Sequence, residues 1–267
     1  MPIHTSVPIL VFDQESFHQV DRRVTGLAFD IHNEFGRYLE ERLYQGELTR
    51  RCRSLGFEVA PEMRIEVSLG DFSKSYFVDH LIQRGVVIET KAVSSLNSAH
   101  KGQTLNYLFL CGLHHGTLLN FRTERVQHEF VSTSLTPADR RQCGIVASDW
   151  KPLTPRCGEL QELLPRLLKE WGAFLDPILY RDAITHFLGG EDRVVREISV
   201  TCGDTEIGTQ KMHLVENDIA FSVTASTHRP ESVFDHQRRF LQHTPLRALH
   251  WINFNHKQIE LRTIERQ

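Results

Sequence analysis

The chain has 267 residues, of which 40% are hydrophobic and 24% are charged, so it can form a hydrophobic core. This composition excludes a disordered or fibrous protein. The 31 Lys and Arg residues against 34 Asp and Glu residues give a net charge of -3, which excludes a strongly basic chromatin-type protein. Any nucleic acid would have to meet a local basic surface.

The N-terminal region and the cysteines bear on the cellular compartment. The apolar stretch over residues 7–12 is interrupted by Pro8 and is far shorter than the roughly 20 residues that cross a bilayer. We therefore expect no membrane span and no secretory signal. The five cysteines are widely spaced and show neither a Cys-x-x-Cys pair nor a zinc-binding spacing. Reduced thiols in a cytoplasmic protein are the simplest interpretation.

The first half of the chain predicts a helix followed by alternating strands and helices. Residues 22–55 carry apolar side chains at helical spacing and predict one long helix that is broken or kinked near Gly36. The elements predicted after it are three strands, a helix and a fourth strand, over residues 63–69, 76–82, 86–92, 98–111 and 115–121. The predicted order is α-β-β-β-α-β.

The same pattern occurs twice in the chain. A shift of 133 residues aligns residues 65–121 with residues 198–254 without a gap, and 11 of the aligned pairs are identical. Unrelated sequences of that length would share roughly three or four identities. Upstream, a shift of 136 residues pairs Gly36 with Gly172 and Tyr44 with Tyr180. We therefore predict an α/β protein of two tandem lobes, each a mixed sheet flanked by helices, that are either fused through their sheets or packed as a pseudo-dimer.

The repeat and the proline positions suggest domain boundaries. Four segments are predicted: an N-terminal extension, a first lobe, a connector rich in helix-stopping prolines and a second lobe, over residues 1–21, 22–131, 132–157 and 158–267.

Two acidic residues and a lysine in the first lobe suggest a catalytic site. Asp79 falls on one predicted strand, and Glu89 and Lys91 fall on the next. Residues two apart on a strand point to the same face, so Glu89 and Lys91 share one face, and hairpin pairing can bring Asp79 beside them. Two close carboxylates favour a divalent cation such as Mg²⁺ or Mn²⁺. A lysine beside them can orient a water molecule and stabilise negative charge on a phosphate.

Three further residues extend the candidate site. Glu41, on the predicted N-terminal helix, could be a third metal ligand, and Gln103 and Tyr107 lie four residues apart on one helix face. Each has a structural alternative, because Glu41 could be a solvated charge and Gln103 and Tyr107 could cap or pack the sheet. Asp79, Glu89 and Lys91 could likewise form a salt-bridged strand face. Tyr44 recurs as Tyr180, which favours a core position for both.

The motifs of the first lobe have a recognisable order. Asp79, followed by Glu89-x-Lys91, is accompanied by three other ordered segments, over residues 36–44, 103–107 and 118–121. Together, over about residues 22–131, they resemble the bacterial GxxExxY family of the PD-(D/E)xK nuclease superfamily. The resemblance implies metal-dependent cleavage of DNA or RNA. The glycine of the family motif falls on Tyr38, so that only its Glu41 and Tyr44 are present.

The second copy lacks this chemistry. The positions that correspond to Glu41, Asp79, Glu89, Lys91 and Gln103 hold Pro177, Met212, Ser222, Thr224 and His236. Framework residues such as Phe121 and Phe254 are shared by the two copies. We therefore expect one active lobe and one catalytically degenerate lobe.

The sequence thus predicts a metal-dependent nuclease acting on nucleic acid, with DNA expected rather than RNA. The alternative is a non-catalytic nucleic-acid-binding or regulatory module built on a nuclease fold. A basic group in the second copy could contact the phosphate backbone, and it consists of Arg238, Arg239, Arg247 and Lys257. An open sheet edge in either lobe would leave room for a homo-oligomer.

Overall fold

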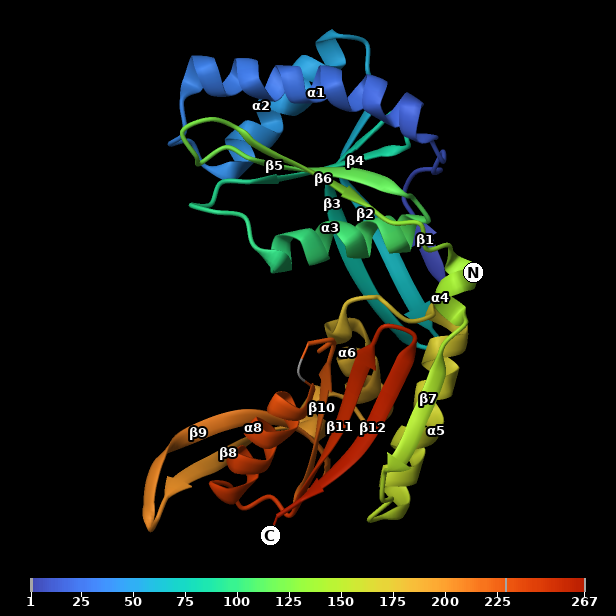
Figure 1. The fold of residues 1–267 in the computed structure, drawn as a ribbon, viewed down its shortest axis with the longest axis vertical. Coiled ribbons are helices and arrows are strands. Elements are labelled where there is room, and N and C mark those ends of the chain that lie inside the picture. The colour runs from blue at the N-terminus through green and yellow to red at the C-terminus, as the bar shows by residue number, and fades with distance from the viewer. Residues whose placement is uncertain (1, 229, 267) are drawn as a thin grey trace. The chain divides into compact units, whose positions relative to one another are not determined.

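The computed structural model describes residues 2–228 and 230–266 and divides into two compact units. The first unit comprises Met1–Ser68 and Ser73–Pro137, and the second comprises Leu69–Phe72 and Ala138–Gln267. Figure 1 shows the helices and strands of both units.

The first unit is a six-stranded sheet with helices on both faces. Its elements, in chain order, are β1 (Ile3–Thr5), α1 (Gln14–Phe35), α2 (Glu41–Ser54), β2 (Val59–Leu69), β3 (Phe72–Ile82), β4 (Val86–Lys91), α3 (Ser98–Cys111), β5 (His115–Asn120) and β6 (Gln127–Ser132). The strand order is β1-β2-β3-β4-β5-β6, in which β4 and β5 run parallel while β3–β4 and β5–β6 are antiparallel. The helices α1 and α2 cover one face and α3 covers the other (Figure 1).

The predicted long helix is two helices in the structure. The side chain of Asp13 accepts a hydrogen bond from the Ser16 amide and begins α1, and Gly36 ends it with a φ of 71°, which glycine adopts without steric cost. The chain then turns and α2 begins at Glu41. The break at Gly36 therefore agrees with the sequence, whereas the predicted start at residue 22 is wrong, because the cap lies further upstream.

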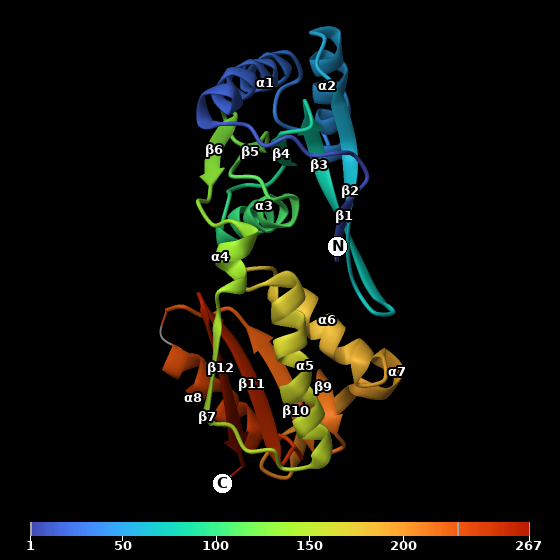
Figure 2. The same cartoon turned by 90° about the vertical axis from the view of Figure 1, so that its right-hand side faces the viewer.

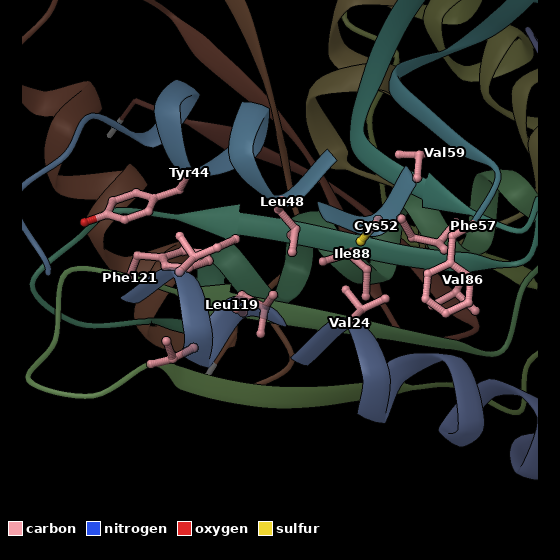
Figure 3. Close-up of a cluster of buried hydrophobic side chains, with 14 of the residues drawn as sticks. Val24, Tyr44, Leu48, Cys52, Phe57, Val59, Val86, Ile88, Leu119 and Phe121 are labelled. Carbon is pink, nitrogen blue, oxygen red and sulfur yellow. The ribbon is translucent and has the colours of Figure 1, made fainter. Parts of the chain in front are cut away.

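The core of the first unit lies between its sheet and the two helices α1 and α2. Val24 of α1 and Leu48 of α2 pack with Ile88 and Leu119, which come from neighbouring strands, and all four side chains are fully buried (Figure 3). Residues of β4 alternate between this face and the face covered by α3. The apolar positions Val86 and Ile88 therefore fix Glu89 and Lys91 on the opposite side of the sheet.

The second unit contains its own six-stranded sheet. Its elements, in chain order, are α4 (Pro137–Arg141), β7 (Gly144–Asp149), α5 (Pro155–Trp171), α6 (Pro177–Phe187), α7 (Glu191–Val194), β8 (Val195–Cys202), β9 (Thr205–Glu216), β10 (Ile219–Thr224), α8 (Pro230–Gln242), β11 (Ala248–Asn255) and β12 (Gln258–Glu265). The strand order is β7-β12-β11-β10-β9-β8. The helices α5 and α6 lie on one face of this sheet and α8 on the other (Figure 2).

Five strands of each unit share their order and directions. In both units two antiparallel strands lead to a central parallel pair, β4–β5 in the first and β10–β11 in the second, and an antiparallel strand follows. The register of the central pairs is also shared, since Lys91 pairs with Asn120 and Thr224 pairs with Asn253.

Hydrogen bonds at matching positions are also the same. The Tyr44 hydroxyl donates to the Gly36 carbonyl at 2.7 Å, and the Tyr180 hydroxyl donates to the Gly172 carbonyl at 2.5 Å. The tyrosine rings also stack on matching phenylalanines, with centroids 4.4 Å apart in the first unit and 4.3 Å apart in the second. Both tyrosines are fully buried, so they belong to the core, as the sequence predicted.

The segments expected to be an extension and a connector form regular structure. Residues 3–5 add strand β1 to the edge of the first sheet through antiparallel pairing with β2, and residues 14–21 belong to α1. The expected connector over 132–157 contains α4, strand β7 and the start of α5. Strand β7 pairs in parallel with β12 at the edge of the second sheet.

Candidate active site

The candidate site lies where β3 and β4 separate. In their antiparallel pairing Ile82 lies opposite Val86, and the last pair is His80 with Ile88. Asp79 and Glu89 would form the next pair, so both lie where the strands begin to diverge. The amide and the hydroxyl of Thr90 both donate to Oδ2 of Asp79, each at 2.8 Å. The Asp79 carboxylate therefore takes the place of a backbone carbonyl as the acceptor for the Thr90 amide. These two hydrogen bonds hold the Asp79 side chain next to β4.

Glu89 and Lys91 lie side by side on the face of β4 away from α1 and α2. Lys91 Nζ donates to Glu89 Oε1 at 2.6 Å. The Glu89 side chain is 1% exposed and the Lys91 side chain is 12% exposed, so the pair is largely removed from water. The second oxygen of Glu89, Oε2, is buried and has no hydrogen-bond partner among the described residues. An ionised carboxylate with a bare buried oxygen is costly unless another group compensates it.

The three side chains are electrostatically coupled. Burial and the nearby Asp79 carboxylate raise the pKa of Glu89 to about 7, against the opposing effect of Lys91. Burial by itself would lower the pKa of the Lys91 ammonium, but the negative charges of Glu89, Asp79 and Glu41 outweigh it and the pKa is raised. Lys91 therefore stays protonated in a site with an excess of negative charge.

Glu41 reaches the same end of β4 from α2. It is the first residue of that helix, and its Oε2 accepts a hydrogen bond from the Ala92 amide at 3.0 Å. Ala92 directly follows Lys91, so the structure brings Glu41 to the site as the sequence predicted. Its influence on the Lys91 pKa supports the same placement.

Gln103 and Tyr107 lie on α3, which packs against β4 and β5. The Gln103 amide donates to the Tyr107 hydroxyl at 2.9 Å. Among the described residues, Gln103 forms no hydrogen bond with Lys91, whose ammonium donates to Glu89. The two residues are thus paired with each other, as their spacing suggested.

The four basic residues predicted as a nucleic-acid contact do not form one patch. Arg238 and Arg239 are on α8, and Arg247 and Lys257 lie at opposite ends of β11. An eight-residue strand is roughly 26 Å long, so those two residues are well separated. Arg247 also forms an ion pair with Asp218, with Nε 2.9 Å from Oδ2. Their contact with a phosphate backbone therefore stays a prediction, for residues that are spread over the unit.

At the matching position of the second unit, hydroxyl groups replace the charges. Ser222 accepts a hydrogen bond from the Gln237 amide at 3.0 Å. Thr224 accepts from the Trp251 indole and donates to Asn253, each at 2.8 Å. Each of the two hydroxyls is therefore bonded to uncharged neighbours, and positions 222 and 224 themselves carry no carboxylate. Apolar side chains of α8 and the sheet pack around Trp251.

Two residues near the site were not found from the sequence. Thr90 orients Asp79, and Arg122 donates weakly to the carbonyls of Ala92 and Leu39, both at 3.4 Å. The alternation of β4 assigns Thr90 to the face opposite Glu89, which concealed its contact with Asp79. Arg122 directly follows the segment 118–121, and its contacts with Ala92 and Leu39 depend on tertiary packing that the local sequence does not show.

The donor set suits a cation of the Mg²⁺ type. No group of three or more His, Cys, Asp or Glu side chains in residues 2–228 and 230–266 is arranged to hold a metal ion. Mg²⁺, however, is usually held by one or two carboxylates and keeps several water molecules. The unpartnered Oε2 of Glu89 and the adjacent Asp79 carboxylate fit this requirement.

Within the described part of the chain, no helix is both long and apolar enough to span a bilayer.

Comparison with known proteins gives one match. A family model described as the PD-(D/E)XK nuclease superfamily matches residues 18–132, from α1 to the end of β6. A search of curated proteins found no match, and neither did a search of solved structures. The mixed sheet flanked by helices agrees with the fold of that superfamily. Over residues 18–132, the chain is therefore similar to the PD-(D/E)XK nuclease superfamily.

Proposed function

We propose that the first unit is a nuclease that hydrolyses phosphodiester bonds of nucleic acid with the help of Mg²⁺ or Mn²⁺. The observation that carries this proposal is the position of Asp79, Glu89 and Lys91 where β3 and β4 diverge, within the segment that matches the nuclease superfamily. A buried carboxylate oxygen without a hydrogen-bond partner supports a cation as the missing component.

Asp79 and Glu89 would hold the metal ion, with Glu41 as an accessory ligand. When bound, the ion supplies Lewis-acid activation of the phosphate and of a water molecule. The two hydrogen bonds from Thr90 both end on Asp79 Oδ2, and they fix the orientation of that carboxylate. Glu41, held by the Ala92 amide, adds negative charge at the end of β4.

Lys91 would act on the substrate directly. Its ammonium carries a positive charge in a largely buried site, where electrostatic interactions are strong. It can orient the attacking water molecule and stabilise the negative charge that develops on the phosphate oxygens. Gln103 and Tyr107, paired on α3, would support the substrate from the same side of the sheet.

We infer that the second unit is a degenerate copy of the first. The shared strand register and the matching hydrogen bonds of Tyr44 and Tyr180 support an internal duplication. The replacement of the charges by Ser222 and Thr224 supports the loss of catalysis. One active unit would cut one strand in each binding event, and the inert unit would take the place of a second subunit and help to dock the substrate.

The test is a cleavage assay on labelled DNA and RNA, single- and double-stranded, with and without Mg²⁺ or Mn²⁺. We expect metal-dependent cleavage, with DNA preferred, that is lost in Asp79→Asn and retained in Ser222→Ala, the matched change in the second unit. An Asp79→Asn protein that cleaves as well as wild type would overturn the proposal. Nucleic-acid binding without any cleavage would favour the non-catalytic module instead.

A further inference from the structure

We propose that the turn between α1 and α2 is a platform for an unpaired nucleotide, with Tyr38 as the stacking residue. This inference rests on the proposed function and assigns its substrate class: nucleic acid with a single-stranded segment at the site. It is drawn from the exposure of Tyr38, the fixed backbone beneath it and the contrast with the second unit.

Tyr38 is exposed to an unusual degree for an aromatic residue. Its side chain is 76% exposed, although the neighbouring Arg37 guanidinium lies 5.3 Å from the ring centre and donates to the hydroxyl at 3.3 Å. Aromatic rings on a protein surface together with guanidinium groups stack on unpaired bases, and such stacking tolerates any base. In a duplex the base faces are covered by neighbouring pairs, so an exposed ring offers little to a fully paired strand.

The backbone under Tyr38 is fixed at both sides. The buried Tyr44 hydroxyl donates to the Gly36 carbonyl at 2.7 Å and accepts from the Leu39 amide at 3.2 Å. Arg122 adds a contact to the Leu39 carbonyl. The turn is therefore held in one shape, and Arg37 and Tyr38 project from it. A preorganised ring loses little conformational freedom when a base stacks on it.

The platform lies within reach of the candidate catalytic residues. Tyr38 and Glu41 are three positions apart in the sequence, so their Cα atoms are at most about 11 Å apart. That distance corresponds to about three nucleotides at 3.4 Å per step. Arg122 lies between the turn and the end of β4, since it contacts the carbonyls of both Leu39 and Ala92. A strand stacked on Tyr38 could thus pass Arg122 and reach Lys91.

Nearby acids limit the positive charge of this surface. Glu40 forms an ion pair with Arg42 at 2.8 Å, and the negative charge of Glu124 attracts the Arg37 guanidinium. The guanidinium of Arg122 and the exposed Arg125 follow β5 on the adjacent loop. Stacking on Tyr38 is therefore expected to contribute more to binding than the charges do.

The matching turn of the second unit has the same frame and different chemistry. The Tyr180 hydroxyl is bonded to the Gly172 carbonyl, as Tyr44 is to Gly36. At the position that matches Tyr38, Phe174 is half-buried and its ring lies against His256, with centroids 6.3 Å apart. Ala173, which matches Arg37, is fully buried. The position of Arg122 holds Asn255, which donates to Glu260. The second unit thus also has an aromatic ring at this turn, but that ring is half-buried, and the buried Arg140 guanidinium is held by the carbonyls of Trp171 and Ala173. The largely exposed ring at this turn belongs to the first unit.

The experiment measures the affinity of the full-length protein, without divalent cations, for a labelled single strand and for a duplex of the same sequence. Tyr38→Ala is expected to weaken single-strand binding by about 5- to 100-fold. Tyr38→Trp should retain or tighten it, and duplex binding should change little in either variant. Phe29→Ala, which removes another exposed aromatic side chain from α1, is the control and should match wild type.

Three results would overturn the platform. They are unchanged single-strand affinity in Tyr38→Ala, an equal loss for the duplex, or weaker single-strand binding by Tyr38→Trp than by the wild type. Tyr38 is exposed, so thermal unfolding should confirm that all variants fold. If cleavage depends on Asp79 while Tyr38→Ala behaves as wild type, only the platform fails. If the wild type neither binds nor cleaves any strand, the proposed function fails as well.

Discussion

The ammonium of Lys91 lies 2.6 Å from Oε1 of Glu89, and the second oxygen of that carboxylate is buried without a partner. Only one of the two carboxylate oxygens of Glu89 thus has a hydrogen-bond partner. Asp79, across the divergence of β3 and β4, adds negative charge that raises the pKa of Glu89. A cation between the two carboxylates would relieve this repulsion and leave Lys91 available to the substrate.

Replacement of Lys91 should separate catalysis from metal binding. In Lys91→Ala we expect the cleavage rate to fall by about 100- to 1,000-fold, because one positive group that stabilises developing charge is lost. Mn²⁺ binding should persist, since Asp79 and Glu89 are unchanged. Cleavage rates and calorimetry on the same protein check this. Loss of metal binding together with activity would show that Lys91 is needed to form the site.

Replacement of Glu89 should remove the stabilisation that a metal ion gives. A bound ion raises stability by mass action, so Mg²⁺ should raise the unfolding temperature of the wild type in a concentration-dependent way. Glu89→Gln retains the shape but loses the charge, and its unfolding temperature should not respond to Mg²⁺. Ser222→Ala is the matched control and should respond as the wild type does. An equal response of Glu89→Gln would contradict the assignment of Glu89.

The two buried tyrosines should differ in function and resemble each other in stability. Tyr44→Phe and Tyr180→Phe each remove a hydroxyl that donates to a glycine carbonyl, at a cost of about 1 kcal/mol or more. Only Tyr44→Phe frees the turn that leads to Glu41, so only that variant should lose activity. Denaturant unfolding and cleavage rates measure the two effects. A loss of activity in Tyr180→Phe would show that the second unit contributes to catalysis.

His250 should make the second unit sensitive to acid. The ring is buried, stacks on Trp150 at 4.1 Å between centroids, and burial lowers its pKa to about 4. In the unfolded chain the His250 ring binds a proton near pH 6.5, whereas in the folded protein it stays neutral down to about pH 4. The free energy of unfolding is therefore highest above pH 6.5 and decreases as the pH falls toward 4. The loss is on the order of 3 kcal/mol.

His250→Phe keeps an aromatic ring next to Trp150 and should flatten this pH dependence. The readout is tryptophan fluorescence, because the three tryptophans, Trp150, Trp171 and Trp251, all belong to the second unit. Equal slopes in His250→Phe and in the wild type between pH 4 and pH 6.5 would show that another group titrates.

Local patterns in the sequence predicted the central elements well. The break at Gly36 follows from a residue that adopts positive φ, and the apolar run of β4 follows from burial on both faces. Edge strands were missed, because β1 has only three residues and β7 is largely exposed, so both depend on a partner strand far away in the sequence. Pairing of that kind has no local signal.

The candidate site was predicted only in part, because local patterns place some of its residues and non-local contacts place the others. Strand alternation suffices to place Glu89 beside Lys91, and hairpin pairing suffices to bring Asp79 near. The role of Thr90 depends on the exact point where two strands separate, and that of Arg122 depends on a loop meeting the α1–α2 turn. Tyr38 stood out only as a departure from a family motif, since its exposure is a tertiary property.

The most direct test of the account is Mn²⁺ titration by calorimetry on the full-length wild type and on Asp79→Ala. We predict that the wild type binds Mn²⁺ and that the Asp79→Ala protein, folded to the same extent by circular dichroism, does not. The absence of binding in the wild type, or equal binding in both proteins, would contradict the assignment of the first unit as a metal-dependent nuclease.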